Sequence, residues 1–243
     1  MKAQDQGLTW GGALRAGALG IAASMVFLAV VGLASGIGVN PIIIVIGVLF
    51  CLGALWQARA RGGLTFVLVI ALLWFVLNMV LFGGILSLAR PASWAEFTVA
   101  VATIAATVVV VMAYRGGRRA GFNKAASNAA TIVRGAAGVT ALALVVGLLA
   151  TFTAHSDAVH TGDIPIAAKS FKFDQKTLTA QAGKVTVYFK NADPSQHDFT
   201  IDKVVHLSVP SFHSRRATFT VAPGTYAFRC TLHTDMKGTL TVQ

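Results

Sequence analysis

The chain has 243 residues, of which 55% are hydrophobic and only 12% are charged. Charged residues make up about a quarter of an average soluble domain, so this composition excludes an ordinary soluble protein. The formal net charge of +11 could suggest a nucleic-acid partner. However, from His155 onward 10 Lys and Arg residues stand against 7 Asp and Glu residues. Most of the excess positive charge therefore lies before or between the apolar runs of the first part of the chain. We expect no nucleic-acid partner.

Long uncharged runs make up the chain as far as about residue 153. Five of these runs are long enough to cross a bilayer as helices, which takes about 20 residues. They are Ala16–Ser35, Ile37–Trp56, Leu64–Leu86, Phe97–Ala113 and Ala136–Thr153. Residues 1–153 are therefore predicted to form an α-helical membrane domain of five transmembrane helices.

A cleaved signal peptide is the alternative interpretation of the first run. Its apolar core is longer than that of a typical signal peptide, and no clear A-x-A cleavage site follows it. We therefore predict a retained helix. Cleavage would leave the other four helices in place.

Basic residues between the runs predict the orientation. Nine of them precede the first run or follow the second or fourth run, whereas only Arg90 lies in the alternate segments. Positively charged loops remain in the cytoplasm. The multi-pass protein is therefore expected in the cell membrane with a cytoplasmic N-terminus, and its C-terminal part on the extracytoplasmic face. The nine residues are Lys2, Arg15, Arg59, Arg61, Arg115, Arg118, Arg119, Lys124 and Arg134.

The predicted membrane helices carry no ionisable residue well inside them and no histidine. Ionisable residues at such positions usually indicate a proton relay or an ion pathway. We expect neither of these, and histidine-bound haem within the membrane is excluded for this chain alone.

A polar linker is predicted at residues 154–163, and its two histidines are expected to be solvated. From Ile164 onward apolar residues alternate with polar ones, as at Val185, Val187 and Phe189. Alternation with a period of two is typical of half-buried strands. About seven short strands separated by turn signals predict an antiparallel β-sandwich over residues 164–243.

The segment CTLHTDM brings together Cys230, His233 and Met236 at three-residue intervals. His197 lies at the start of a predicted strand, 33 residues before Cys230. One thiolate, two imidazoles and one thioether form the ligand set of a blue-copper site, in which methionine is the weak axial ligand. The sequence therefore predicts that these four residues bind one copper ion.

Other kinds of site fit these residues less well. Structural zinc sites usually use several cysteines and histidines in paired knuckles, and the segment has no second cysteine. A nucleophilic Cys–His pair would have no use for the methionine, and a binuclear copper centre would need a second cysteine nearby. His206 and His213 are expected to be isolated surface histidines.

Residues 163–243 resemble the cupredoxin family, which includes plastocyanin, amicyanin and pseudoazurin. The matching stretches are SFKFDQKTLTAQAGKVTVYFKN, SQHDF around His197, and APGTYAFRCTLHTDM. The resemblance implies a Greek-key sandwich, a type 1 copper site and electron transfer through His233. Two positions depart from relatives: Leu232 replaces a frequent proline, and Asp198 replaces a frequent asparagine. A carboxylate close to the site would favour Cu(II) and lower the reduction potential.

These observations predict a membrane-anchored type 1 copper protein that transfers single electrons on the outer face of the membrane. We expect no enzymatic activity and no small-molecule substrate, because no second copper is available for oxygen chemistry. Its expected partners are redox proteins such as a respiratory or oxidase complex. The alternatives are a copper storage or delivery protein and an accessory subunit of a membrane oxidase complex.

Overall fold

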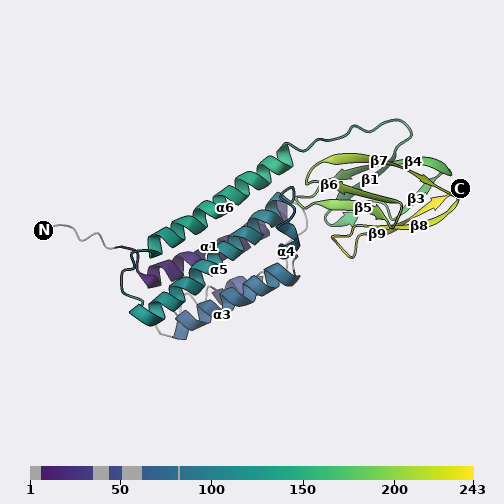
Figure 1. Cartoon of the computed structure of the whole chain (residues 1–243). Coiled ribbons are helices and arrows are strands. Elements are labelled where there is room, and N and C mark those ends of the chain that lie inside the picture. Colours follow the sequence, from purple (N-terminus) through teal and green to yellow (C-terminus); the bar gives the residue numbers. More distant parts are fainter. Residues whose placement is uncertain (1–6, 35–43, 51–61, 82) are drawn as a thin grey trace. The chain divides into compact units, whose positions relative to one another are not determined.

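The computed structural model describes residues 7–34, 44–50, 62–81 and 83–243. These residues form two compact units. The first takes most of the described residues up to Val146, and the second consists of Arg90–Trp94 and Gly147–Gln243 among the described residues. The first unit is helical, and the second contains all the β-strands (Figure 1).

Among the described residues, three helices are long and apolar enough to cross a membrane, judged by length and composition. They are α1 (Trp10–Ala34), α5 (Trp94–Ala120) and α6 (Ala129–Phe152). The apolar stretches in them have mean hydropathies of 2.2, 2.2 and 2.1. At a rise of about 1.5 Å per residue, each helix exceeds the roughly 30 Å of a hydrocarbon core. Three of the five predicted runs are therefore helices of the expected kind.

The third predicted run is divided rather than continuous. It forms α3 (Gly62–Val76), a π-helical turn η1 (Leu77–Leu81) and the short helix α4 (Gly84–Ser87). Gly83 has a φ of 71°, a left-handed conformation that glycine adopts at little cost and that ends a right-handed helix. The apolar pattern alone did not reveal this break.

Most of the second predicted run lies outside the described residues. Within it, residues 44–50 are helical. The count of five transmembrane helices therefore stays a prediction.

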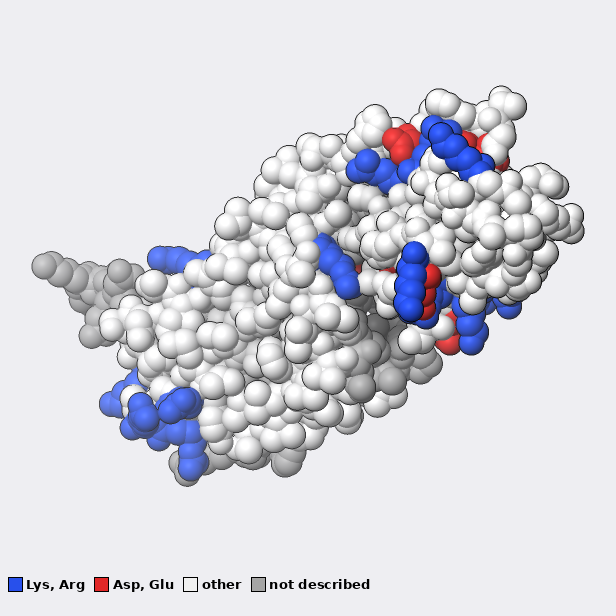
Figure 2. Space-filling model, turned by 45° about the vertical axis from the view of Figure 1, so that its right-hand side comes forward, with Lys and Arg blue, Asp and Glu red and all other residues white. Residues whose placement is uncertain are grey.

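Charged side chains are distributed unevenly over the helical unit. Arg118 and Arg119 lie in the last turn of α5. Figure 2 shows basic side chains gathered at one end of the helical unit, with an uncharged surface along its side. A band without charges that ends in basic residues is the pattern expected of helices in a bilayer.

Nine strands in two sheets form the β-sandwich of the second unit (Figure 1). One sheet has the order β2-β1-β4-β7, and the other has the order β3-β9-β8-β5-β6. The strands are β1 (Ile164–Lys169), β2 (Lys172–Phe173), β3 (Thr177–Ala180), β4 (Gly183–Asn191), β5 (His197–Ile201), β6 (Val205–Val209), β7 (Ser214–Val221), β8 (Gly224–Arg229) and β9 (Lys237–Val242). The predicted β-sandwich is confirmed.

The prediction that this sandwich is wholly antiparallel is wrong. β1 pairs with β4 in parallel, and β3 pairs with β9 in parallel. The connections that cross between the sheets bring together strands that do not follow one another in the chain. Alternation of apolar residues shows which face of a strand is buried, but it carries no information on the direction of the neighbouring strand.

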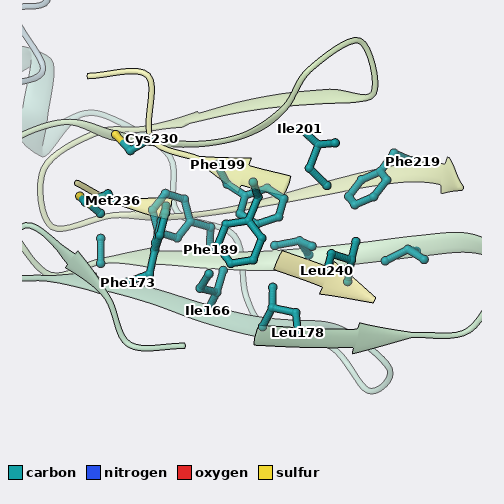
Figure 3. Close-up of a cluster of buried hydrophobic side chains, with 14 of the residues drawn as sticks. Ile166, Phe173, Leu178, Phe189, Phe199, Ile201, Phe219, Cys230, Met236 and Leu240 are labelled. Carbon is teal, nitrogen blue, oxygen red and sulfur yellow. The ribbon is translucent and has the colours of Figure 1, made fainter. Parts of the chain in front are cut away.

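Inward-facing residues of both sheets fill the core, as Figure 3 shows. Phe189, Phe199 and Phe228 are each at most 1% exposed, and burying a side chain of this size contributes about 1.5–3 kcal/mol. The rings of Phe199 and Phe228 pack with their centroids 5.0 Å apart. In β5, Asp198 and Thr200 are also buried, although their positions alternate with those of the core residues. This strand is therefore covered on both faces.

The predicted linker is bonded to the edge of the sandwich. The Arg216 guanidinium forms two bonds of 2.7 Å to the Asp163 carboxylate, and it lowers the pKa of that carboxyl to about 2. Nearer the start of the linker, the Asp157 backbone N–H donates to the Ser214 carbonyl at 2.9 Å. These contacts fix the residues just before β1 to strand β7.

Arg90–Trp94 also belongs to the second unit. Ser211 donates to the Ala92 carbonyl through its hydroxyl at 2.8 Å and through its backbone N–H at 3.3 Å. The Ser93 hydroxyl accepts a bond of 2.7 Å from the Gln196 N–H. The loop before α5 is thus hydrogen-bonded to the two loops that flank β5 and β6.

Candidate metal centre

Three of the predicted ligands come from the short connection between β8 and β9. Cys230 follows the last residue of β8, and Met236 precedes the first residue of β9. The backbone N–H of Cys230 donates to the Met236 carbonyl at 2.9 Å, and the N–H of Met236 donates to the His233 carbonyl at 3.0 Å. These bonds fold the seven residues into a closed loop, so the regular spacing in the sequence becomes a cluster in space.

His197 reaches the same place from the start of β5, and its side chain is fully buried. The Cys230 Sγ lies 3.8 Å from the Nδ1 of His197 and 3.5 Å from the Nδ1 of His233. The ligand atoms of these three residues all lie within 4.8 Å of one another.

These distances fit a trigonal metal site. Metal bonds of about 2.3 Å to sulfur and 2.0 Å to nitrogen, spread at about 120°, hold the two atoms about 3.7 Å apart. The observed separations of 3.8 and 3.5 Å lie on either side of that value. The two sulfur–nitrogen separations are therefore compatible with one metal ion bound by all three side chains.

Met236 lies at the same end of the core as Cys230, as Figure 3 shows. Its side chain is 1% exposed and belongs to the same buried cluster. The thioether is thus buried at the end of the core where the thiol also lies, and its role as an axial ligand stays a prediction.

Met236→Leu should leave copper bound and retain the copper–thiolate absorption while raising the reduction potential. The long axial thioether bond is weak, but its electron donation stabilises Cu(II) more than Cu(I). Met236→Gln supplies a harder oxygen donor and should lower the potential. Redox titration would resolve a shift of about 59 mV, which is a tenfold change in the equilibrium constant. Unchanged potentials in both variants would show that Met236 is a bystander.

A buried carboxylate orients the first imidazole. The Asp193 Oδ2 lies 2.9 Å from the Nε2 of His197, and both side chains are at most 1% exposed. Burial alone would raise the pKa of Asp193, but the bond from His197 and two backbone N–H groups lower it. An ionised carboxylate can only accept, so the His197 Nε2 carries the proton and the Nδ1 lone pair is free for a metal.

Burial sets the protonation of Cys230 and His233, the other two predicted ligands with ionisable side chains. It raises the pKa of the Cys230 thiol to about 11. For His233, burial and the neighbouring His197 lower the pKa to about 4. At neutral pH the His233 imidazole is therefore ready to bind a metal, whereas the thiol must first lose its proton.

Copper affinity should therefore rise about tenfold for each pH unit between about pH 7 and 10, because binding displaces one proton from Cys230. His233 adds nothing to the slope, since its pKa of about 4 keeps it neutral throughout that window. Competition titrations against a chelator of known pH dependence would measure the slope. A flat profile would contradict the assignment of Cys230 as a ligand.

Asp198 lies beside the thiol, and its carboxylate accepts hydrogen bonds from several neighbouring groups. Its Oδ2 is 3.8 Å from the Cys230 Sγ, and its backbone N–H donates to the same sulfur at 3.4 Å. Thr231 donates to the carboxylate through its hydroxyl at 2.7 Å and through its N–H at 2.9 Å. The Thr200 hydroxyl donates to it at 2.7 Å. The residue that departs from relatives therefore places a carboxyl group beside the predicted ligand Cys230.

The remaining histidines lie outside the cluster. The Nδ1 of His206 is 2.8 Å from the Thr200 hydroxyl, and the Nδ1 of His213 is 2.6 Å from the Ser211 carbonyl. His155 and His160 are exposed, and His155 pairs with Asp157 at 3.2 Å. None of these four belongs to the group of metal-binding side chains found among the described residues.

Two residues at the site were not predicted from the sequence. Asp193 stands four residues before His197, and its carboxylate could have been considered as a partner of that imidazole. Phe171 packs against both ligand imidazoles, and it lies too far away in the sequence to give any signal.

Comparison with protein families supports a cupredoxin-like domain in the C-terminal part of the chain. Residues 140–242 match the family model of the cupredoxin-like domain, which confirms the predicted resemblance. Similar solved structures include reduced amicyanin with a tryptophan replaced by tyrosine, at 23% identity, covering 35% of this chain and 86% of that chain with a TM-score of 0.31. Another is amicyanin from Paracoccus versutus, at 21% identity, covering 35% and 85%, also with a TM-score of 0.31. A search of curated proteins found no match.

Proposed function

From the cupredoxin-like domain that the chain carries over residues 140–242, we propose a membrane-anchored type 1 copper protein that transfers single electrons. The observation that supports this most is the convergence of two Nδ1 atoms on one thiol, at 3.8 and 3.5 Å. In this proposal His197, Cys230 and His233 hold the copper in a plane, and Met236 is the axial ligand. Bound copper would supply a one-electron couple between Cu(II) and Cu(I).

The protein's own part in electron transfer is to keep these side chains still. Cys230, Met236 and His197 are each at most 1% exposed, and the sandwich and the closed ligand loop hold them. Electron transfer is fast when the ligands do not have to move as the charge of the metal changes. The activation barrier then contains only a small contribution from rearrangement of the site. His233 is only partly buried, so we propose that electrons enter and leave through its imidazole.

The helical part supports membrane anchoring. Three described helices have the length and the composition to cross a bilayer. We propose a five-helix membrane domain over residues 1–153, a linker over 154–163 and a copper domain over 164–243. The distribution of basic residues favours a cytoplasmic N-terminus in the cell membrane and a copper domain on the outer face. Its partners would then be membrane-associated redox proteins on that face.

A reporter fused after Gln243 should behave as extracytoplasmic, because nine basic residues lie in predicted cytoplasmic segments and one lies outside them. Protease added to spheroplasts should also reach the copper domain. A reporter placed after Arg61, in a predicted cytoplasmic loop, is the matched control and should give the opposite signal. A cytoplasmic signal from Gln243 would overturn the orientation and the proposed partners.

Repeated redox cycling of the copper-loaded full chain in mild detergent tests the proposed function. An electron carrier should keep one copper per chain through many cycles and recover its visible spectrum each time. Loss of Cu(I) to a chelator within the first cycles would instead favour copper delivery. Absence of copper binding would overturn both functions.

A further inference from the structure

The turn between β1 and β2 has an unfavourable backbone. Ser170 and Phe171 have φ values of 54° and 57°, although neither is a glycine. Two successive left-handed residues form the type of two-residue turn in which asparagine and glycine are preferred. A Cβ makes this conformation costly, and more so for a bulky aromatic residue. Strain of this kind persists only where the surroundings enforce it, and it is frequent at functional sites.

The Asp193 carboxylate enforces this conformation. Its Oδ1 accepts from the Ser170 N–H at 2.7 Å, and its Oδ2 accepts from the Phe171 N–H at 2.9 Å. Its Oδ2 also accepts from the Nε2 of His197 at 2.9 Å. One buried carboxylate therefore ties the turn directly to a ligand imidazole.

The strained turn brings the Phe171 ring onto both ligand imidazoles. Its centroid lies 5.5 Å from that of His197 at an interplanar angle of 77°, and 4.7 Å from that of His233 at 82°. The two imidazole centroids lie 4.6 Å apart. The three rings thus pack as a group, and edge-to-face contacts at these distances are attractive.

We propose that the Ser170–Phe171 turn is a brace that holds the two histidine ligands in their binding orientation. His197 is fixed by β5 and by Asp193, whereas His233 comes from a loop. Phe171 packs the His233 ring against the better-fixed ring of His197, and the resulting restraint compensates for the strain in the turn. Phe171 and Asp193 are positioning residues in this proposal, and they act on copper only through the imidazoles. The proposal rests on the proposed copper site.

Loss of Cu(I) to an excess of a colorimetric chelator tests the brace in the detergent-solubilised full chain. Phe171→Leu should release Cu(I) about tenfold faster than the wild type, since outer partners of metal ligands typically change metal affinity by 10- to 100-fold. Phe171→Tyr keeps the ring and should restore the wild-type rate. Phe212→Leu is the matched control, because Phe212 is half exposed and has a similar φ of 61°. It should leave the rate unchanged.

Two further variants separate the brace from general packing. Ser170→Gly removes the Cβ of one left-handed residue and keeps the Phe171 ring, so it should leave the release rate unchanged. Asp193→Asn keeps the shape of the side chain but weakens its bonds both to the turn and to His197. It should accelerate release as Phe171→Leu does, and it carries the test if that variant does not fold. Equal rates for Phe171→Leu, Asp193→Asn and the wild type would overturn the brace, whereas a wild type that takes up no copper would overturn the proposed function.

Discussion

Cys230→Ser should abolish the intense visible absorption of the copper-loaded protein. That absorption arises from the copper–thiolate bond, and a serine hydroxyl cannot replace the thiolate as a soft ligand. The structure offers no substitute among the described residues, where Cys230 is the free cysteine. The loss should be complete rather than partial, and an absorption spectrum together with metal analysis would measure it.

The histidines provide the controls for this experiment. His197→Ala should disturb the spectrum severely, because the Nδ1 of His197 lies 3.8 Å from the Cys230 Sγ. His206→Ala and His213→Ala should leave it nearly unchanged, because both imidazoles bond to groups outside the cluster. An unaltered spectrum in Cys230→Ser would refute the type 1 assignment.

Asp198→Asn should raise the reduction potential of the bound copper. The carboxylate lies 3.8 Å from the Cys230 Sγ and is 1% exposed, so its charge opposes the gain of an electron at the site. A unit charge about 4 Å away contributes about 4 kcal/mol at an effective dielectric constant of about 20. The surrounding hydrogen-bond donors reduce this value. We therefore expect a rise of at least about 59 mV, a tenfold change in the equilibrium constant.

Asparagine suits this test because it has the same shape and can still accept the bonds from Thr231. Asp202→Asn is the matched control. Asp202 has a side chain that is 63% exposed and is paired with Arg229 at 2.9 Å, so solvent screens its charge. The reduction potential of the Asp202→Asn variant should match that of the wild type. If Asp198→Asn and Asp202→Asn gave the same potential, the buried charge would have no influence on the copper.

Much of the copper domain could be predicted from the sequence because its determinants are local. The alternation at Val185, Val187 and Phe189 fixes which face of β4 is buried, and the structure buries all three side chains. The spacing of Cys230, His233 and Met236 lies within one loop, so a single turn brings these residues together. His197 could be added because a complete donor set needs a second imidazole.

Features that depend on distant parts of the chain could not be predicted. The parallel pairing of β1 with β4 arises from crossover connections, and apolar alternation does not encode these. The buried state of Asp198 follows from the ligand loop that covers it, although its position in β5 alternates with those of core residues. The contact between Phe171 and the histidine rings depends on backbone strain, which composition and periodicity cannot show.

In the helical part, the apolar runs predicted three helices of the observed kind. They did not predict the interruption at Gly83, because a glycine within an apolar run is compatible with both a continuous and a broken helix. The φ of 71° at this residue decides between the two. Sequence patterns therefore identified which residues are apolar, but not where the third run stops being helical.

The burial of Cys230 also affects the reactivity of its thiol in the metal-free protein. Oxidants and disulfide exchange both act on the thiolate form of a cysteine. Burial keeps Cys230 1% exposed and raises its pKa to about 11, so very little thiolate is present at neutral pH. The folded chain thereby protects this predicted copper ligand from sulfenic acid formation and from cross-linking between copies. The burial that would require the thiol to lose a proton before it bound a metal thus also keeps the thiol unreactive in the metal-free chain.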